Sequence, residues 1–228
     1  MLNNPAKKSN NETFGMSCEK AICEVNSDVN PKSKISDDRC NKEIVEKLKT
    51  PFSVFQKTNK ISPLIYTGEN GNKTDFVDTD GKTYSIKSNI KGNNKVCPQG
   101  IGQPTKKVFM DLVYNHINKN KVTDLPNADL KKNIFEHIDK YLNLYLQNLF
   151  CCDYLIHITD SMSFKLIDKM KFIFDKEKVT FTNTCEKWKE GITVKYNNVS
   201  IGEFQFHRNR DCIKFRFLLK NLLSIITK

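Results

Sequence analysis

An aspartate and a lysine lie on either side of a short turn in the middle of the chain, at a spacing that can bring their side chains together. Two β-prone runs flank Thr79-Asp80-Gly81, a triplet that favours a three-residue hairpin loop with Gly81 in the left-handed conformation. In that register Asp75 lies opposite Ser85 and on the same face as Lys87. A two-residue loop would put Asp75 and Lys87 on opposite faces, so the pairing depends on the loop type.

This layout suits metal-assisted hydrolysis of a phosphate ester. The Asp75 carboxylate would hold a divalent cation beside the phosphate, and the backbone carbonyl of Ile86 would be a further ligand. The Lys87 ammonium would orient the attacking water and offset the charge of the transition state. An oxygen-rich, partly hydrated site of this kind suits Mg²⁺.

The pattern resembles the PD-(D/E)XK nuclease superfamily, and more closely the type II restriction endonucleases. The motif covers residues 75–87, and a looser similarity runs through residues 12–217 by way of GENGNKTDF, KSNIKGNNKVCPQ, IGQPT and IGEFQFHRNR. Two positions depart from the family pattern. Thr74 precedes the aspartate where proline is usual, and Ser85 stands where a second carboxylate is usual. Glu69 or Glu19 is expected to supply the missing acid, and the sequence leaves both open.

The resemblance implies Mg²⁺-dependent hydrolysis of double-stranded DNA at a short specific sequence, leaving 5′-phosphate and 3′-hydroxyl ends. It implies a role in restriction, with a cognate DNA methyltransferase as functional rather than physical partner. A palindromic site cut on both strands favours a homodimer. Two alternatives stay open: a structure-specific or repair nuclease of the same superfamily, and a basic DNA-binding protein without catalysis, in which the aspartate and the lysine are ordinary turn and surface residues.

Two further segments are candidates for DNA contacts, because amide and guanidinium groups there can reach phosphates and base edges. The first is a glycine-punctuated loop that precedes a helix capped by Thr105. The second is a strand whose Phe204 and Phe206 face the core, together with the turn after it. The alternative for both is a solvated surface. The candidate residues are Lys91, Asn93, Asn94, Gln99, Gln103, Gln205, His207, Arg208, Arg210 and Arg216.

The overall charge agrees with a polyanionic partner. The chain has 37 basic and 26 acidic residues, a net charge of +11, and such a surface attracts nucleic acid by counterion release. A composition rich in lysine and asparagine is an alternative source of that charge. The grouping of Arg208, Arg210 and Arg216 in a chain with only four arginines is more specific, since arginine supplies planar bidentate donors.

A cytoplasmic protein is expected. The longest apolar stretch, residues 142–158, is interrupted by polar residues, and the first residues have no apolar segment typical of a secretory signal. The cysteines are then expected to be reduced and to act as small buried hydrophobes.

The periodicity of apolar residues indicates mixed secondary structure. A helix is predicted from residue 12 to 25, capped by Asn10 or Asn11, and a second helix begins at Ser36-Asp37-Asp38 and ends at Pro51. Further helices follow Pro104 and span residues 129–150. Strands are predicted within 61–97 and at 178–182, 192–196, 199–207 and 212–219, with a tight turn at Asn197-Asn198.

The expected fold is therefore α/β (α+β) and restriction-endonuclease-like: a mixed central sheet flanked by helices on both sides, with the active hairpin at one edge and a C-terminal β-hairpin region. The expected organisation is a disordered tail over 1–11 and a single endonuclease domain over 12–228. Within that domain the catalytic hairpin is 74–88 and the DNA-contacting strands are 192–219.

Overall fold

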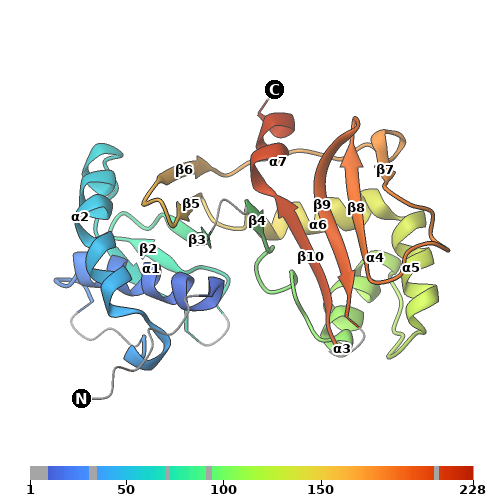
Figure 1. The fold of residues 1–228 in the computed structure, drawn as a ribbon, viewed down its shortest axis with the longest axis horizontal. Coiled ribbons are helices and arrows are strands. Elements are labelled where there is room, and N and C mark those ends of the chain that lie inside the picture. The colour runs from blue at the N-terminus through green and yellow to red at the C-terminus, as the bar shows by residue number, and fades with distance from the viewer. Residues whose placement is uncertain (1–9, 31–34, 70–71, 91–93, 208–210, 228) are drawn as a thin grey trace, which may run out of the picture. The chain divides into compact units, whose positions relative to one another are not determined.

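The computed structural model describes residues 10–30, 35–69, 72–90, 94–207 and 211–227. The chain divides into two compact units. The first, called here the N-terminal unit, contains residues 1–93 and 152–169. The second, the C-terminal unit, contains residues 94–151 and 170–228. Each unit has its own five-stranded sheet, so the single central sheet expected from the sequence is replaced by two (Figure 1).

The N-terminal unit is a mixed sheet with helices packed on it. Its strands are β1 (Leu64–Tyr66), β2 (Phe76–Asp78), β3 (Thr83–Asn89), β5 (Tyr154–Thr159) and β6 (Phe164–Asp168), in the order β1-β2-β3-β5-β6. The pair β3–β5 is parallel and the other pairs are antiparallel. Its helices are α1 (Asn11–Val25), α2 (Lys42–Thr58) and a short 3₁₀ turn, Asp37–Arg39.

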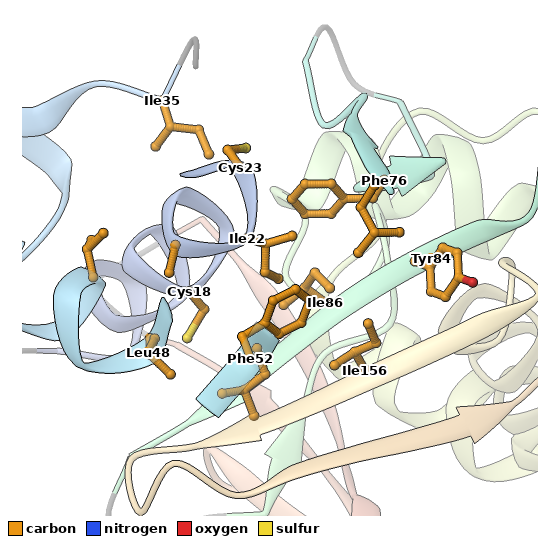
Figure 2. Close-up of a cluster of buried hydrophobic side chains, with 14 of the residues drawn as sticks. Cys18, Ile22, Cys23, Ile35, Leu48, Phe52, Phe76, Tyr84, Ile86 and Ile156 are labelled. Atoms are coloured by element: carbon orange, nitrogen blue, oxygen red, sulfur yellow. The ribbon is translucent and has the colours of Figure 1, made fainter. Parts of the chain in front are cut away.

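One face of this sheet forms a core with both helices (Figure 2). Apolar residues of the strands, among them Tyr84, Ile86 and Ile156, pack with Ile22 of α1 and Phe52 of α2. Cys18 and Cys23 belong to the same core, as expected of small hydrophobes. Because α1 and α2 share one core on one face, the helices of this unit do not flank the sheet on both sides.

The central hairpin has the predicted register. Phe76 pairs with Tyr84 and Val77 with Thr83, the Asp78 N–H donates to the Lys82 carbonyl, and Gly81 has φ +83°. The three-residue loop is therefore confirmed. The prediction that this hairpin forms a sheet edge is wrong, since β1 flanks β2 and β5 flanks β3.

The start and the end predicted for the second helix are also wrong. Asn41, rather than the Ser36 segment, caps α2 by accepting from the Ile44 N–H, and the helix continues through Pro51 to Thr58. A proline removes one helical hydrogen bond, here the one to the carbonyl of Lys47. Lys47 is exposed, so water can satisfy that carbonyl, while Phe52 in the next position is buried in the core. The tertiary burial outweighs the local cost.

The C-terminal unit is an antiparallel sheet backed by helices. Its strands are β4 (Lys95–Val96), β7 (Val179–Phe181), β8 (Gly191–Tyr196), β9 (Val199–Phe206) and β10 (Ile213–Leu218), in the order β4-β10-β9-β8-β7. The four strands expected in the last third are confirmed, and Asn197 and Asn198 have the positive φ angles of a tight turn. Its helical segments are α3 (Lys106–Phe109), a π-helical turn (Met110–Tyr114), α4 (Asn115–Asn118), α5 (Asn127–Glu136), α6 (Ile138–Leu149) and α7 (Leu219–Ile226).

Aromatic rings join the sheet of this unit to α6. Tyr145 stacks on Phe215 with ring centroids 4.4 Å apart and meets Phe204 edge-on at 5.8 Å. The predicted cap at Thr105 is confirmed, but the helix expected over 129–150 is two helices, because the backbone leaves helical geometry at His137. Within the described part of the chain, no helix has both the length and the apolar character needed to cross a bilayer.

Candidate active site

Asp75 lies just before β2, where the hairpin ladder ends. Its N–H donates to the Tyr84 carbonyl at 3.0 Å, one residue out of register with the Phe76–Tyr84 pair. Its side chain is 8% exposed and turns toward β3, where Oδ2 accepts from the Ile86 N–H at 2.6 Å and from the Ser85 hydroxyl at 3.1 Å. Both donors bind the same oxygen. Strand β3 therefore holds the carboxylate through Oδ2, and Oδ1 takes no part in these two hydrogen bonds.

The nearby aspartate in the same hairpin has a structural role. Asp78 Oδ1 accepts from the N–H groups of Asp80 and Lys82, and Oδ2 accepts from the Tyr84 hydroxyl. All of these partners belong to the loop and the strand that follows it. Asp78 therefore stabilises the turn, and Asp75 is the hairpin aspartate that faces the candidate site.

Glu19 of α1 comes close to this aspartate because the helix approaches the sheet closely. A Cβ on Gly15 would lie 3.1 Å from the Ser88 hydroxyl of β3, so the glycine allows α1 to contact that strand. Glu19 follows one helical turn later on the same face. Its Oε2 accepts from the Tyr66 hydroxyl at 3.3 Å.

The electrostatics of Glu19 link three charged groups. Burial, and secondly the negative charge of Asp75, raise the pKa of Glu19 from 4.5 to about 7, although Lys87 and the Tyr66 hydroxyl act in the opposite direction. Two carboxylates and one ammonium group thus interact near the middle of α1. A carboxyl whose pKa is raised in this way, beside a second carboxylate and a cation, is typical of a functional site.

Lys87 is partly buried and lies on the face of β3 that carries Ser85. Its partner in the parallel ladder is His157 of β5. The His157 Nε2 atom lies 2.8 Å from Asn89 Oδ1, and burial, with a smaller contribution from Lys165, lowers the pKa of His157. A neutral, hydrogen-bonded imidazole indicates a structural role for this histidine. Strand β5 itself was missed in the sequence.

Glu69, the other acid considered, lies in the loop between β1 and β2. Its N–H donates to the Thr67 carbonyl at 2.8 Å, and its carbonyl accepts from the Asn72 N–H at 3.2 Å. The Thr67 N–H in turn donates to the carbonyl of Asp75. This hydrogen bond joins the segment that carries Glu69 to the backbone of Asp75.

The donor atoms suit a hard cation. Among the described residues no group of three or more His, Cys, Asp or Glu side chains is arranged to hold a metal ion. Glu19 and Asp75 supply carboxylate oxygens. In an extended strand the C=O of a residue points to the same neighbour as its N–H, so the Ile86 carbonyl is on the side of Asp75. An oxygen-only set of donors fits Mg²⁺.

The candidate DNA contacts that the structure describes belong to the C-terminal unit. Gln103 is exposed, while Asn94, Gln99 and His207 are partly buried. Gln205 and Arg216 both bind Glu203. The remaining candidates, Lys91, Asn93, Arg208 and Arg210, lie outside the described residues.

The fold and the site together define the class: an α/β protein in which an acid from helix α1 and an acid just before strand β2 lie near a lysine on the central strand β3. The chain is 36% identical over 170 residues to the type II restriction enzyme CviAII of Paramecium bursaria Chlorella virus 1, a match that covers 71% of this chain and 46% of the viral enzyme. It thus spans about half the length of that relative. No family model and no solved structure matches. The resemblance to type II restriction enzymes is confirmed by this similarity, and the restriction-endonuclease fold stays a prediction.

Proposed function

We propose that this protein is a type II restriction endonuclease that hydrolyses double-stranded DNA at a short specific sequence with Mg²⁺. The observation that carries the proposal is that Glu19 lies close enough to Asp75 and Lys87 for their charges to act on its pKa, which is raised. Glu19 thus supplies a second carboxylate from α1, in place of the acid that the hairpin lacks at Ser85. The similarity to CviAII supports the same activity independently.

In this proposal Asp75, Glu19 and the Ile86 carbonyl hold the cation, and we favour Glu19 over Glu69 as the second acid. The bound cation would polarise the scissile phosphate and stabilise the added negative charge of the transition state. Ser85 is a positioning residue, since its hydroxyl and the Ile86 N–H fix Asp75 through Oδ2.

Lys87 acts on the water and the phosphate. Its ammonium group orients the water whose oxygen forms the new bond to phosphorus, and it offsets the charge on the phosphoryl oxygens. The bond from phosphorus to the 3′ oxygen breaks and that oxygen gains a proton, which leaves the 5′-phosphate and 3′-hydroxyl ends implied by the family resemblance. A homodimer on a palindromic site, with a methyltransferase protecting the same site, completes the proposed system.

The test is digestion of a sequenced plasmid with the full chain and Mg²⁺, followed by mapping of the ends. Cutting at one repeated sequence is expected, and chelation of the metal should stop it. Lys87→Ala and Asp75→Asn should each lower the cleavage rate by at least about 100-fold, because each removes charge that acts in the transition state. Binding of the same plasmid fragment should stay within a few-fold of the parent protein.

Matched controls lie on the same hairpin. Lys82→Ala and Asp80→Asn make the same chemical changes at exposed loop positions and should leave the rate nearly unchanged. Full activity of Lys87→Ala or Asp75→Asn would remove the assignment of the site. Absence of any Mg²⁺-dependent cutting by a folded parent protein, on plasmid, nicked and branched DNA alike, would remove the proposed function.

A further inference from the structure

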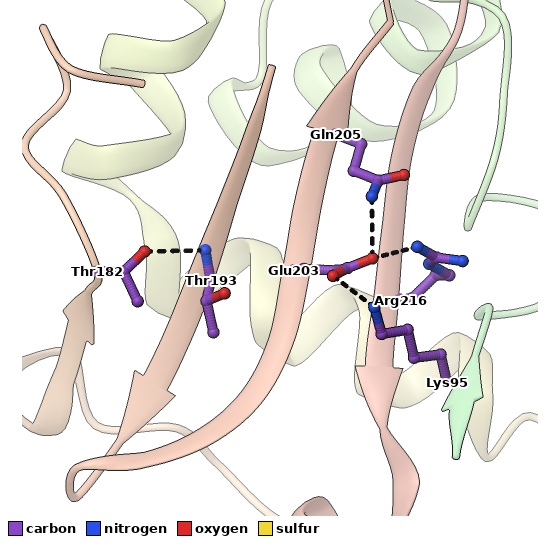
Figure 3. Close-up of polar contacts among 6 residues, drawn as sticks. All are labelled: Lys95, Thr182, Thr193, Glu203, Gln205 and Arg216. Carbon is purple, nitrogen blue, oxygen red and sulfur yellow. Dashed lines mark hydrogen bonds and ion pairs between the residues drawn. The ribbon is translucent and has the colours of Figure 1, made fainter. Parts of the chain in front are cut away.

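One carboxylate in the C-terminal sheet holds three side chains from three strands (Figure 3). Glu203 of β9 accepts through Oε2 from the Lys95 ammonium of β4 at 2.9 Å. Through Oε1 it accepts from the Gln205 amide at 3.1 Å and pairs with the Arg216 guanidinium of β10. We call Lys95, Glu203, Gln205 and Arg216 the Glu203 cluster.

The cluster lies on the face of the sheet that is turned away from α6. Along β9 and β10 the buried residues alternate with partly exposed ones, and the buried set, including Phe204 and Phe215, contacts α6. The opposite face carries the apolar Ile201 and Leu218, on strands that contact α7, and is otherwise polar. Thr193 and Lys214 pair with Glu203 and Gln205 of the cluster, and Lys195 lies farther along β8, opposite Ser200.

Stability alone does not account for the cluster. The side chains of Glu203 and Arg216 are only 17% and 18% exposed, so forming the pair removes two charges from water, and apolar residues often stabilise such a position as well or better. Two cations share one carboxylate, and within the described residues the buried Arg216 Nε has no hydrogen-bond partner. An arrangement that retains excess positive charge on a sheet face is suited to an anionic ligand.

What the cluster supplies is fixed orientation. The Gln205 Nε2 atom donates to Glu203, so the NH₂ end of the amide faces the carboxylate. Its Oε1 and the second N–H can then form the bidentate pair that glutamine makes with adenine. Arg216 uses Nη2 for Glu203 and its Nε is buried. The N–H groups of Nη1 and the second N–H of Nη2 are left for the pairing that arginine makes with guanine. Side chains that are oriented before binding lose less entropy when they meet a ligand.

We propose that Glu203 is a positioning residue for sequence recognition: it presents Gln205, Arg216 and Lys95 on this polar face to the base edges of duplex DNA. The proposal rests on the proposed function, from which the duplex is taken, and Lys195 and Lys214 would meet its phosphates. The positive balance of the face, with Lys95, Lys195, Lys214 and Arg216 against Glu203, favours a polyanion such as DNA over a neutral or basic partner.

The test uses the full chain with Lys87→Ala to prevent cutting, a pool of duplexes with a randomised centre, and sequencing of the bound fraction. Glu203→Gln keeps the shape and removes the charge that orients the cations. It should lower the preference for the parent sequence by about tenfold or more, as expected for one bidentate pair, while binding to unrelated duplexes stays equal or becomes tighter. Glu177→Gln, an equal charge change at an exposed position, should keep the parent preference.

Arg216→Lys is the second variant, because it keeps the charge and removes the planar fork. It should also reduce the preference, even if Glu203→Gln fails to fold. The inference would be overturned if a folded Glu203→Gln protein kept its sequence preference, or if it lost affinity equally for specific and unrelated duplexes. Cutting of the plasmid at one sequence would still support the proposed function in that case. Loss of all sequence preference in the parent protein would count against both.

Discussion

Glu19 of α1 brings a carboxylate from a distant part of the chain near Asp75. The hairpin has Ser85 where the nucleases that the motif resembles usually have an acid, and the serine hydroxyl donates to the remaining acid, Asp75. Glu19 then meets Asp75 from α1, with its oxygen held by Tyr66. Burial, and secondly the negative charge of Asp75, raise the pKa of Glu19, so without a cation the two carboxylates repel each other.

This shift predicts how the metal-free protein responds to pH. The pKa of Glu19 rises from 4.5 to about 7 on folding, so the folded state holds a proton that the unfolded chain releases. The stabilisation from this proton is complete below pH 4.5 and is lost as the pH rises to about 7. In chelator, the free energy of unfolding of the wild type should fall across this range by up to about 3 kcal/mol relative to Glu19→Gln. Parallel denaturant titrations of the two proteins measure the difference, and curves that stay parallel would contradict the shift.

At the scale of elements, the hairpin depends on one backbone conformation. Gly81 has φ +83°, a region that costs a residue with a Cβ about 1–2 kcal/mol, and a Cβ there would meet no atom within 4 Å. Gly81→Ala should therefore lower the free energy of unfolding by about 1 kcal/mol through backbone strain alone. Gly81→Asn should lose less, because asparagine tolerates this conformation. Thermal or denaturant unfolding of the three proteins gives the comparison, and equal losses for alanine and asparagine would point to a cause other than φ.

The same hairpin shows which parts of the fold can be predicted from the sequence. Its loop, register and strands depend on neighbouring residues, so turn chemistry predicts them. Strand β5 was missed because it is buried in the interior of the sheet beside β3, and its apolar run YLIHI lacks the alternation of a half-exposed strand. The passage of α2 through Pro51 was missed because the burial of Phe52 decides it.

The candidate site was predictable in part for the same reason. Asp75, Ser85 and Lys87 belong to one local unit, and their face followed from the loop. The choice between Glu19 and Glu69 depends on how α1 packs on the sheet, through the close approach at Gly15 and Ser88, and no local pattern encodes that contact. The Glu203 cluster likewise joins Lys95 to β9 across β10, a juxtaposition that only strand order creates.

At the scale of the whole molecule, charge should govern affinity for DNA irrespective of sequence. A net charge of +11 favours release of counterions from the duplex, and the slope of log K against log salt changes by about 0.9 for each phosphate contact. If the polar face of the C-terminal sheet lies on the backbone, replacing both Lys195 and Lys214 by glutamine should make that slope shallower by nearly two. The double variant Lys171→Gln and Lys176→Gln changes the net charge equally at exposed positions away from the strands.

Binding of a short duplex of unrelated sequence, measured across a range of salt concentrations in chelator, separates these two cases. Total charge acts at long range and is screened alike in both variants, whereas phosphate contacts change the number of counterions released. A shallower slope for the sheet variant alone would locate the DNA on that face. Equal slopes for the two variants would show that the lysines act only through net charge, and base contacts by the Glu203 cluster would then lack the backbone contacts that bring them into the groove.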